Sequence, residues 1–397
     1  MLREENAKIE FERMADPCVC VSHRDLAGRG IIVCGGGLRY FTCAWVCINI
    51  LRHRGCLLPI QLWHLGPSEV PNDARKLLAA LNVECVDAHE IRKEHSARIL
   101  NGWELKPYAM IHCRFREVLL LDADNVAVVD PTFLFDIPEY KRDGAVFWPD
   151  FNRLSLARPI WELTGVPYRD EPEFETGQIL VDKVRCAKAL ALTMWMNEHS
   201  DFWYRYIHGD KETFHMAWRK LEQPYAMPSR GIHRLSGTMC QHDFAGQRIF
   251  QHRNMKKWTL GKNPHVPGFE FEEICVGFIE QLRPHVRELR GIPTFDKELS
   301  AALLDRVVTY HRVGHDRRKM VMCADGTIGL GQDRMERFWG VRLEGDSRIL
   351  EIYGDDGITA RLEPQTGDST TWCGAWLVYE RMPLEISVVS DAAAVSA

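Results

Sequence analysis

Two aspartates directly after an apolar run are the residues whose types and spacing best suit chemistry. The run Glu117–Leu121 leads into Asp122-Ala-Asp124. In an extended chain, residues two apart point to the same side, so both carboxylates leave the strand together. Carboxylate oxygens are the ligands that Mg²⁺ and Mn²⁺ prefer, and these ions also bind phosphate oxygens. The pair therefore predicts a metal site, although the same tripeptide is common in solvated turns.

A histidine followed by cations stands far downstream. His252 precedes Arg253, Lys256, Lys257 and Trp258. A neutral imidazole is a good ligand for Mn²⁺, and a lysine or arginine can bind a diphosphate. The alternative is a basic surface stretch with one packed tryptophan.

Three carboxylates beside glycines are candidates for catalysis. Glu175 precedes a strand predicted over 179–182, and Asp210 and Glu212 stand where a helix begins. A carboxylate at such a position could act on a substrate at the edge of a sheet. Asp210 could instead serve only as the cap of its helix.

A triple glycine follows the first predicted strand. Gly35, Gly36 and Gly37 could form a turn that passes close to a phosphate, and Arg39 could meet the same group. The spacing does not fit the dinucleotide-binding pattern, because Tyr40 occupies the position of its last glycine. A plain strand-to-helix turn and a surface arginine are the alternatives.

The segments that must position these residues alternate between strands and helices. Strands are predicted at 30–34, 58–64, 83–87 and 117–121, and helices at 40–54, 72–81 and 106–115. This alternation predicts an α/β fold with a mostly parallel central sheet that is covered on both faces. Ligands bind such sheets at the carboxyl ends of the strands, where the aspartates lie.

The pattern changes near residue 290. A short helix over 297–308 is followed by recurring turn signals and by strand-like runs at 349–353, 358–362, 375–379 and 384–389. Short strands at this spacing predict a small C-terminal antiparallel β domain. We therefore expect four parts: a polar lead-in over 1–29, a catalytic domain over 30–290, a β domain over 291–390 and a disordered tail over 391–397.

Composition excludes several classes of protein. A net charge of −5 argues against a nucleic-acid partner, because such binding relies on cations that neutralise phosphates. The sequence has no apolar run long enough for a transmembrane segment, and its charged start does not fit a secretory signal. The thirteen cysteines, scattered through apolar segments, are typical of reduced thiols. We expect a cytoplasmic protein, with association at a membrane surface left open.

The order of these segments resembles the fungal Mnn-type α-mannosyltransferases and, more distantly, other retaining GT-A glycosyltransferases such as the glycogenin-like enzymes. The fungal relatives also carry an N-terminal membrane anchor, which this sequence does not show. The matching segments lie at 28–37, 62–66, 106–109, 119–124, 130–135, 147–150, 175–178, 209–214 and 251–258.

The resemblance implies a GT-A nucleotide-sugar-binding fold and a site for Mn²⁺ or Mg²⁺. The metal would be held by Asp122 and Asp124, with His252 as the third ligand. This sequence has Lys-Lys-Trp where the relatives have Lys-Pro-Trp after that histidine. The residues assigned to donor binding are Gly35, Gly36, Arg39, Lys106, Asp122 and Lys257. Those assigned to catalysis are Glu175, Asp210 and Glu212.

The function expected from the resemblance is the retaining transfer of α-mannose from GDP-mannose to a glycan acceptor. A UDP-sugar donor and a sugar-binding protein without catalysis are the alternatives. The acceptor hydroxyl would attack from the same face of the sugar, or one of the three catalytic carboxylates would form a transient covalent intermediate. The sequence does not decide between these two routes.

Overall fold

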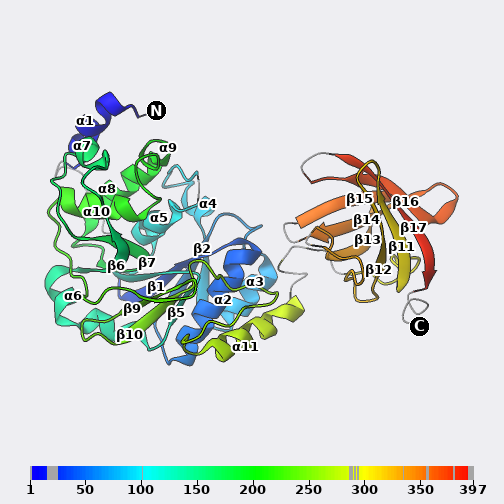
Figure 1. The fold of residues 1–397 in the computed structure, drawn as a ribbon, viewed down its shortest axis with the longest axis horizontal. Helices are drawn as coiled ribbons and strands as arrows, with labels where there is room; N and C mark the ends of the chain where they lie inside the picture. The colour runs from blue at the N-terminus through cyan, green and yellow to red at the C-terminus, as the bar shows by residue number, and fades with distance from the viewer. Residues whose placement is uncertain are drawn as a thin grey trace. The chain divides into compact units, whose positions relative to one another are not determined.

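The computed structural model divides into two compact units, residues 1–289 and 290–397 (Figure 1). The part of the chain that the structure describes does not include Cys18, Cys20 or residues 392–397 of the predicted tail. The eleven described cysteines are free thiols, as expected. The described residues are 2–15, 26–100, 102–285, 289, 292, 295–333, 335–354, 357–378 and 381–391.

A six-stranded sheet in the order β3-β2-β1-β4-β7-β6 forms the centre of the first unit. Strands β1 to β4 are parallel, whereas β7 runs antiparallel to both of its neighbours. The predicted mostly parallel sheet is therefore confirmed. The strands are β1 (Arg29–Cys34), β2 (Ile60–His64), β3 (Val83–Asp87), β4 (Glu117–Asp122), β6 (Ala145–Arg153) and β7 (Pro172–Asp182).

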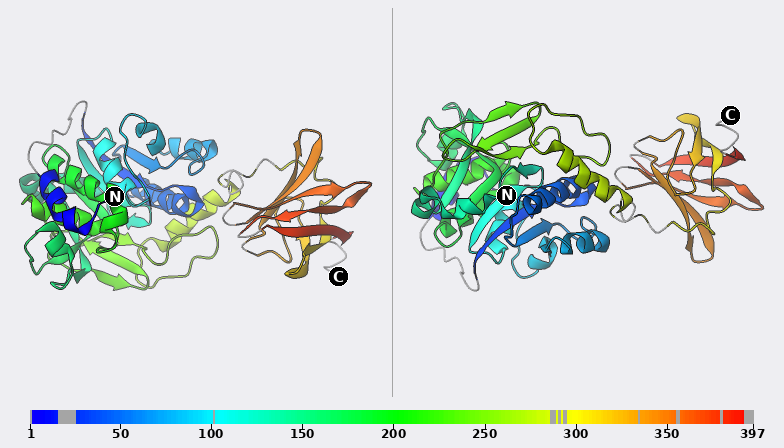
Figure 2. Two further views of the ribbon diagram at one scale, coloured as in Figure 1. Left: turned by 90° about the horizontal axis from the view of Figure 1, so that it is seen from above. Right: turned by 90° about the horizontal axis from the view of Figure 1, so that it is seen from below.

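Both faces of this sheet are buried under helices (Figures 1 and 2). Alternate residues of β1 enter different cores: Ile31 and Val33 lie in one, and Ile32 in the other. One face packs against α2 (Gly37–His53), α3 (Asn72–Ala79) and α11 (Glu272–Leu282). The other packs against α5 (Leu105–His112), α8 (Ala187–Glu198) and α10 (Lys211–Lys220).

A second, four-stranded sheet in the order β5-β10-β9-β8 lies beside the end of β4. Its strands pair antiparallel, and His252 at the end of β10 faces Asn125 at the start of β5. This pairing brings the downstream histidine next to the aspartate pair. The strands are β5 (Asn125–Ala127), β8 (His233–Leu235), β9 (Thr238–His242) and β10 (Arg248–His252).

The predicted polar lead-in contains a helix that the sequence analysis missed. Phe11 of α1 (Glu4–Met14) is fully buried, and its ring lies 5.8 Å from that of Trp203. One apolar side of a short charged helix is enough to anchor it. The remaining short helices of this unit are α4 (Ala88–Ile91), η1 (Pro131–Asp136), α6 (Pro138–Asp143), α7 (Ile160–Thr164), α9 (Ser200–Trp203) and η2 (Arg283–His285).

The second unit is a seven-stranded antiparallel sheet in the order β12-β11-β17-β16-β15-β14-β13. The predicted C-terminal antiparallel β structure is thus confirmed. One face of the sheet carries a core that includes Trp339, Leu350 and Ile386. The strands are β11 (Arg306–Arg312), β12 (Asp316–Met322), β13 (Phe338–Glu344), β14 (Ser347–Gly354), β15 (Gly357–Gln365), β16 (Asp368–Trp376) and β17 (Met382–Asp391).

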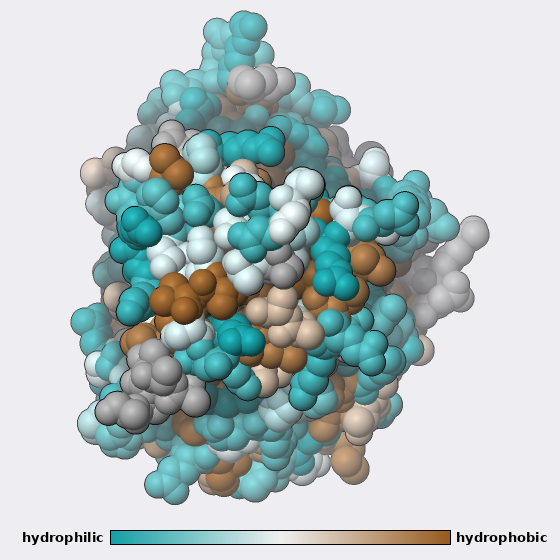
Figure 3. Space-filling model, turned by 90° about the vertical axis from the view of Figure 1, so that its right-hand side faces the viewer, coloured by the Kyte–Doolittle hydropathy of each residue, from teal (hydrophilic) through white to brown (hydrophobic). Residues whose placement is uncertain are grey.

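The surface of the second unit mixes polar side chains with patches of apolar ones (Figure 3). Its exposed apolar residues include Leu330 and Leu343, which are 60% and 54% exposed. Among the described residues of both units, no helix has the length and apolar character needed to cross a bilayer.

The helix predicted over 297–308 is wrong. Residues 297–305 form turns, and β11 starts at Arg306. The strand pairs with β12 on one side and β17 on the other, and Val308 and Tyr310 point into the core. Sheet pairing on both sides of β11 overrides a local helical spacing of apolar residues.

Candidate functional site

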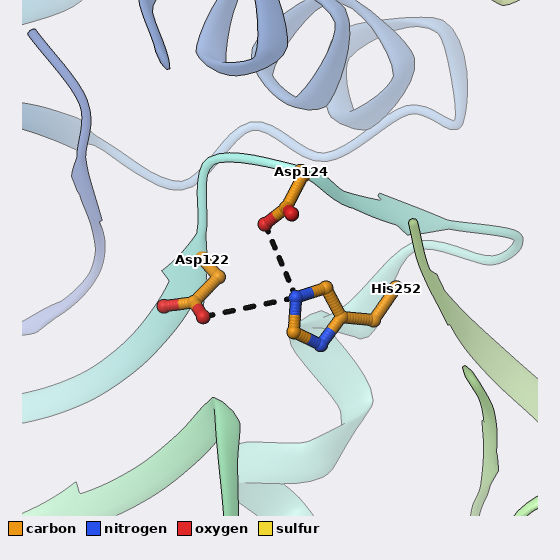
Figure 4. A group of neighbouring side chains, drawn as sticks. All are labelled: Asp122, Asp124 and His252. Carbon is orange, nitrogen blue, oxygen red and sulfur yellow. Dashed lines mark hydrogen bonds and ion pairs between the residues drawn. The ribbon is translucent and has the colours of Figure 1, made fainter. Parts of the chain in front are cut away.

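Asp122, Asp124 and His252 form a three-residue group at the carboxyl end of β4 (Figure 4). One ligand atom from each lies within 4.8 Å of the others. The His252 Nε2 atom is 3.1 Å from Asp124 Oδ1 and 3.8 Å from Asp122 Oδ2. Two carboxylate oxygens and one imidazole nitrogen are a donor set that suits Mn²⁺. Among the described residues, no other group of this kind is found.

Sheet pairing explains why these side chains meet. Asp122 ends the buried strand β4, and Asp124 lies in the turn into β5. Because β10 pairs with β5, His252 reaches this turn from 128 residues away in the sequence. The backbone N–H of Arg253 also donates to the Asp124 carbonyl at 3.0 Å, which fixes the end of β10 against the turn.

Each aspartate has its own lysine. Lys106, on α5, lies 2.8 Å from Asp122 Oδ1 and 3.5 Å from Asp210 Oδ2. Lys257 contacts Asp124 Oδ2. Burial lowers the pKa of both amines, but the neighbouring carboxylates outweigh it and hold their pKa above the usual range. Both lysines are therefore charged at neutral pH.

Glu175 faces the other nitrogen of His252. Its Oε1 lies 3.2 Å from Nδ1, although the pair does not meet hydrogen-bond geometry, and it accepts the Gly177 N–H at 2.8 Å. A side chain at Gly177 would come within 2.5 Å of the imidazole, so this glycine is required by close packing. A carboxylate behind a histidine orients the ring and leaves the second nitrogen free for a metal.

The charges of this site do not balance. The carboxylates exceed the lysine amines by two formal negative charges, and without a metal the protonated His252 imidazole, with a pKa of about 10, offsets one of them. The four carboxylates are Asp122, Asp124, Glu175 and Asp210, and the two amines are Lys106 and Lys257.

The pKa values of the site reflect this surplus. Burial raises the pKa of Asp122, and it does the same for Asp124, but there His252 and Lys257 outweigh it and the net pKa is lowered. Burial lowers the pKa of His252, yet Asp124 and Glu175 raise it to about 10. The group is therefore held together by cations, which is the role that a divalent ion would take over.

The sequence left open whether Asp210 serves only as a helix cap, and the structure shows that it does not. It stands at the N-cap position of α10, but its side chain makes no capping hydrogen bond. Instead, Oδ2 accepts the Thr176 hydroxyl at 3.0 Å, beside Lys106. The carboxylate is thus directed toward the site and held on the same side as Asp122.

Glu212, also predicted to be catalytic, is placed differently. It is 2% exposed, accepts the His208 N–H at 3.1 Å and lies 3.9 Å from Lys211. Burial raises its pKa to about 7. Lys211 in turn pairs with Asp150 at 2.5 Å and Glu173 at 2.6 Å. These contacts indicate that Glu212 supports the loop that carries Asp210.

The residues predicted to cradle the donor phosphates are only partly near the cluster. Gly35 packs closely, since a side chain there would lie 3.3 Å from Ala123 between the two aspartates. At Gly36 an added side chain would meet the Glu69 carboxylate at 2.2 Å. Arg39 is exposed and stacks on Tyr40. A role for these residues in donor binding stays a prediction.

Two other cations of the His252 segment are engaged elsewhere. Arg253 is fully buried, pairs with Glu272 at 3.0 Å and stacks on Trp258. Lys256 donates to the Ser236 hydroxyl at 2.7 Å. Of the three basic residues in this segment, Lys257 is the one that reaches the acid pair.

Thr176 and Asn125 are site residues that the sequence analysis missed. Thr176 holds Asp210, and Asn125 donates to the Gly177 carbonyl and to Gln178 Oε1, both at 2.9 Å. Asn125 thereby ties the turn after Asp124 to β7. Its place beside the aspartates was a signal, but a short polar side chain there equally fits a solvated turn.

The family of the chain follows from a comparison with family models. The model described as "Mannosyltransferase putative" (Mannosyl_trans3) matches residues 28–166 and 167–252, which is more than half of the chain. The chain belongs to this mannosyltransferase family. The matched region contains Asp122, Asp124 and His252. The family and the mostly parallel sheet, with its acid pair after β4, agree with the predicted GT-A-type fold.

Curated relatives share the same region. The α-1,2-mannosyltransferase MNN24 of Candida albicans is 27% identical over 267 residues, which cover 56% of this chain and 37% of that protein. The α-1,2-mannosyltransferase MNN2 of Saccharomyces cerevisiae is 26% identical over 275 residues, covering 57% and 45%. The chain thus spans less than half the length of these relatives.

Solved structures show a more distant likeness. Core-mannan synthase A of Aspergillus fumigatus, in a form with Mn and GDP, is 9% identical at a TM-score of 0.36, covering 54% of this chain and 75% of that one. The galactosyltransferase LgtC is 13% identical at a TM-score of 0.35, covering 50% and 73%. Similarities of this size carry no further conclusion.

Proposed function

We propose that the protein is a metal-dependent, retaining α-mannosyltransferase that transfers mannose from GDP-mannose to a glycan acceptor. The observation that carries the proposal is the group Asp122, Asp124 and His252 inside a chain of the mannosyltransferase family. The names of relatives such as MNN24 and MNN2, which are α-1,2-mannosyltransferases, support mannose as the sugar.

The residues present fit a divalent cation. Two carboxylate oxygens and one imidazole nitrogen converge, and the four carboxylates of the buried site outnumber its two lysine amines. Asp122, Asp124 and His252 would hold the ion. An ion held there would supply Lewis-acid chemistry that offsets charge on the departing nucleoside diphosphate.

The two lysines have different proposed roles. Lys257 lies on the Asp124 side, where it can bind a phosphate oxygen of the donor and stabilise the leaving group. Lys106 lies between Asp122 and Asp210 and holds both carboxylates in place. Because both amines stay charged, neither serves as a proton acceptor at neutral pH.

Asp210 and Glu175 are the carboxylates that can face the reacting sugar. Asp210 is fixed by Thr176 and Lys106, whereas Glu175 is turned toward His252. A negative charge at Asp210 would stabilise the oxocarbenium-like sugar that forms as the diphosphate leaves. In the covalent route a carboxylate oxygen of Asp210 would bond to the anomeric carbon as the sugar–phosphate bond breaks. The acceptor oxygen would then displace this carboxylate, and its hydroxyl proton would pass to the departing nucleoside diphosphate.

The test is a transfer assay with purified protein. GDP-mannose, UDP-glucose and UDP-galactose are each supplied with Mn²⁺ and an α-mannobiose acceptor, and products are read by mass spectrometry and by the NMR coupling of the anomeric proton. We expect an α-linked mannotriose from GDP-mannose alone, and none after EDTA. Transfer from a UDP-sugar instead, or an inverted linkage, would overturn the proposal.

Binding gives a second readout. Thermal stability should rise on addition of GDP with Mn²⁺, because a ligand that binds only the folded state stabilises it. UDP with Mn²⁺ serves as the matched control. Stabilisation by UDP but not by GDP would contradict the choice of donor.

A further inference from the structure

Trp103 differs from every other tryptophan of this chain. The sequence contains twelve, and all of them are described. Eleven are at most 9% exposed, whereas Trp103 is 48% exposed. A tryptophan gains more than any other side chain from burial, so an exposed indole held in a fixed place is unusual.

Trp103 is linked through its backbone to Lys106 and through its indole to the residue before Asp210. Its backbone carbonyl accepts the N–H of Lys106, the lysine between Asp122 and Asp210. Its six-membered ring packs on Gly209, where an added side chain would lie 3.1 Å from the ring, and Gly209 directly precedes Asp210. The backbone of Gly209 also has a positive φ of 78°, so two requirements favour glycine there.

Neighbouring rings extend this surface. The centroid of Trp103 lies 6.0 Å from that of Tyr204 and 6.4 Å from that of His208, which is exposed. The adjacent Glu104 is fully buried and accepts the Ser200 hydroxyl at 2.6 Å. Scattered exposed apolar residues need no explanation, but this one is held by ring contacts and packs on the residue next to Asp210.

We propose that Trp103 is the stacking platform for a sugar ring of the acceptor glycan. The inference rests on the proposed function and adds to it the side from which the acceptor enters. The apolar C–H face of a pyranose suits the negative face of an indole. Trp103 lies close to the pair Lys106 and Asp210. The donor diphosphate is instead expected beside Lys257, which contacts Asp124.

Fluorescence quenching tests the platform without any catalysis. Acrylamide should quench an accessible tryptophan in the wild type, and α-1,2-mannobiose should protect it. In Trp103→Phe, both the accessible population and the protection should be lost. Equal protection in the two proteins, or none in the wild type, would overturn the assignment.

Kinetics separate the acceptor from the donor. Trp103→Ala should raise the KM for mannobiose about tenfold, as expected for loss of one stacking contact, with the Kd for GDP and Mn²⁺ unchanged. Trp103→Phe should restore most of the affinity. Phe133→Ala is the matched control, because Phe133 is 40% exposed on η1, which packs against α6, and its loss should change neither constant.

Three outcomes distinguish failure of the Trp103 platform from failure of the proposed function. Transfer that proceeds with an unchanged acceptor KM in Trp103→Ala would overturn the platform alone. A weaker Kd for GDP in the same variant would also overturn it, because the indole would then belong to the donor. Absence of transfer from every nucleotide sugar would instead overturn the proposed function, while the quenching result still decides whether Trp103 binds a sugar.

Discussion

The two units of the chain bury charge in opposite ways. In the C-terminal unit, Glu336 accepts from Tyr310 at 3.0 Å and pairs with Arg318 at 2.6 Å. Glu351 lies 2.8 Å from Arg342 and 3.2 Å from Arg361. Among the described residues of this unit, both buried carboxylates therefore have at least one arginine of their own, as buried ion pairs require.

In the N-terminal unit, the carboxylates gathered around the end of β4 are short of cations. Asp122 and Asp210 share the single amine of Lys106, and Glu175 has only the imidazole of His252. Such an imbalance destabilises a fold unless something else supplies positive charge. The contrast teaches that an unpaired surplus of buried charge, rather than buried charge itself, marks the functional unit.

The largest effect should come from replacing one of the proposed metal ligands. Asp124→Asn should lower the rate of transfer about a thousandfold or more, or about 4 kcal/mol, because a neutral amide is a poor ligand for a divalent cation. Mn²⁺ titration by calorimetry should show the matching loss of affinity. Asp73→Asn, at an exposed surface ion pair, is the control and should leave both unchanged. Full transfer by Asp124→Asn would place the metal elsewhere.

A core substitution in the C-terminal unit should destabilise that unit alone. Trp339 is fully buried there, and Trp339→Ala should lower the unfolding free energy of the C-terminal unit by about 3–5 kcal/mol through the cavity it leaves. Calorimetry should show one thermal transition shifted and GDP binding intact. Leu343→Ala, at a half-exposed position on β13, should shift neither transition measurably. If both transitions move together, the units are not independent.

Glu212 should make the folding stability of the N-terminal unit depend on pH. Its pKa is about 7 in the folded protein, above its ordinary 4.5, so the folded state binds more protons between these values. Stability should therefore be full below about pH 4.5 and fall as the pH rises through about 7. At pH 8, Glu212→Gln should be more stable than the wild type by about 2 kcal/mol, and at pH 4.5 equally stable. Thermal melts at both values test this, with the exposed Glu162→Gln as control.

The smallest effect is expected at a hydrogen bond within the site. Thr176→Val removes the donor to Asp210 and should lower kcat/KM about tenfold, because a buried carboxylate loses one of its two partners. Thr176→Ser keeps the hydroxyl and should stay close to the wild type. Mn²⁺ affinity should be the same in all three proteins. A change in Mn²⁺ affinity would mean that Asp210 belongs to the metal group.

Sequence reasoning was most successful where local pattern and function coincide. An apolar strand that ends in two aspartates predicts its own burial and the side to which both acids point. The prediction that His252 joins Asp122 and Asp124 came through the family resemblance, and the pairing of β10 with β5 now accounts for it. A cytoplasmic location stays a prediction.

What the sequence could not show depends on tertiary contacts. Leu299, Leu303 and Val307 have helical spacing, yet the first two lie in turns and the third in β11, because the sheet supplies pairing partners. In the same way, nothing local distinguishes Trp103 from the eleven buried tryptophans, or Thr176 from any strand threonine. Their roles follow from which distant segments pack beside them.

The pairing of β10 with β5 also sets the order in which the site can form. Both carboxylates are in the chain by residue 124, but the imidazole arrives 128 residues later. Contacts of such high sequence separation form late, since a long loop must close first. A divalent ion would therefore bind after most of the fold has formed. It would stabilise the folded state and would not act as a folding nucleus.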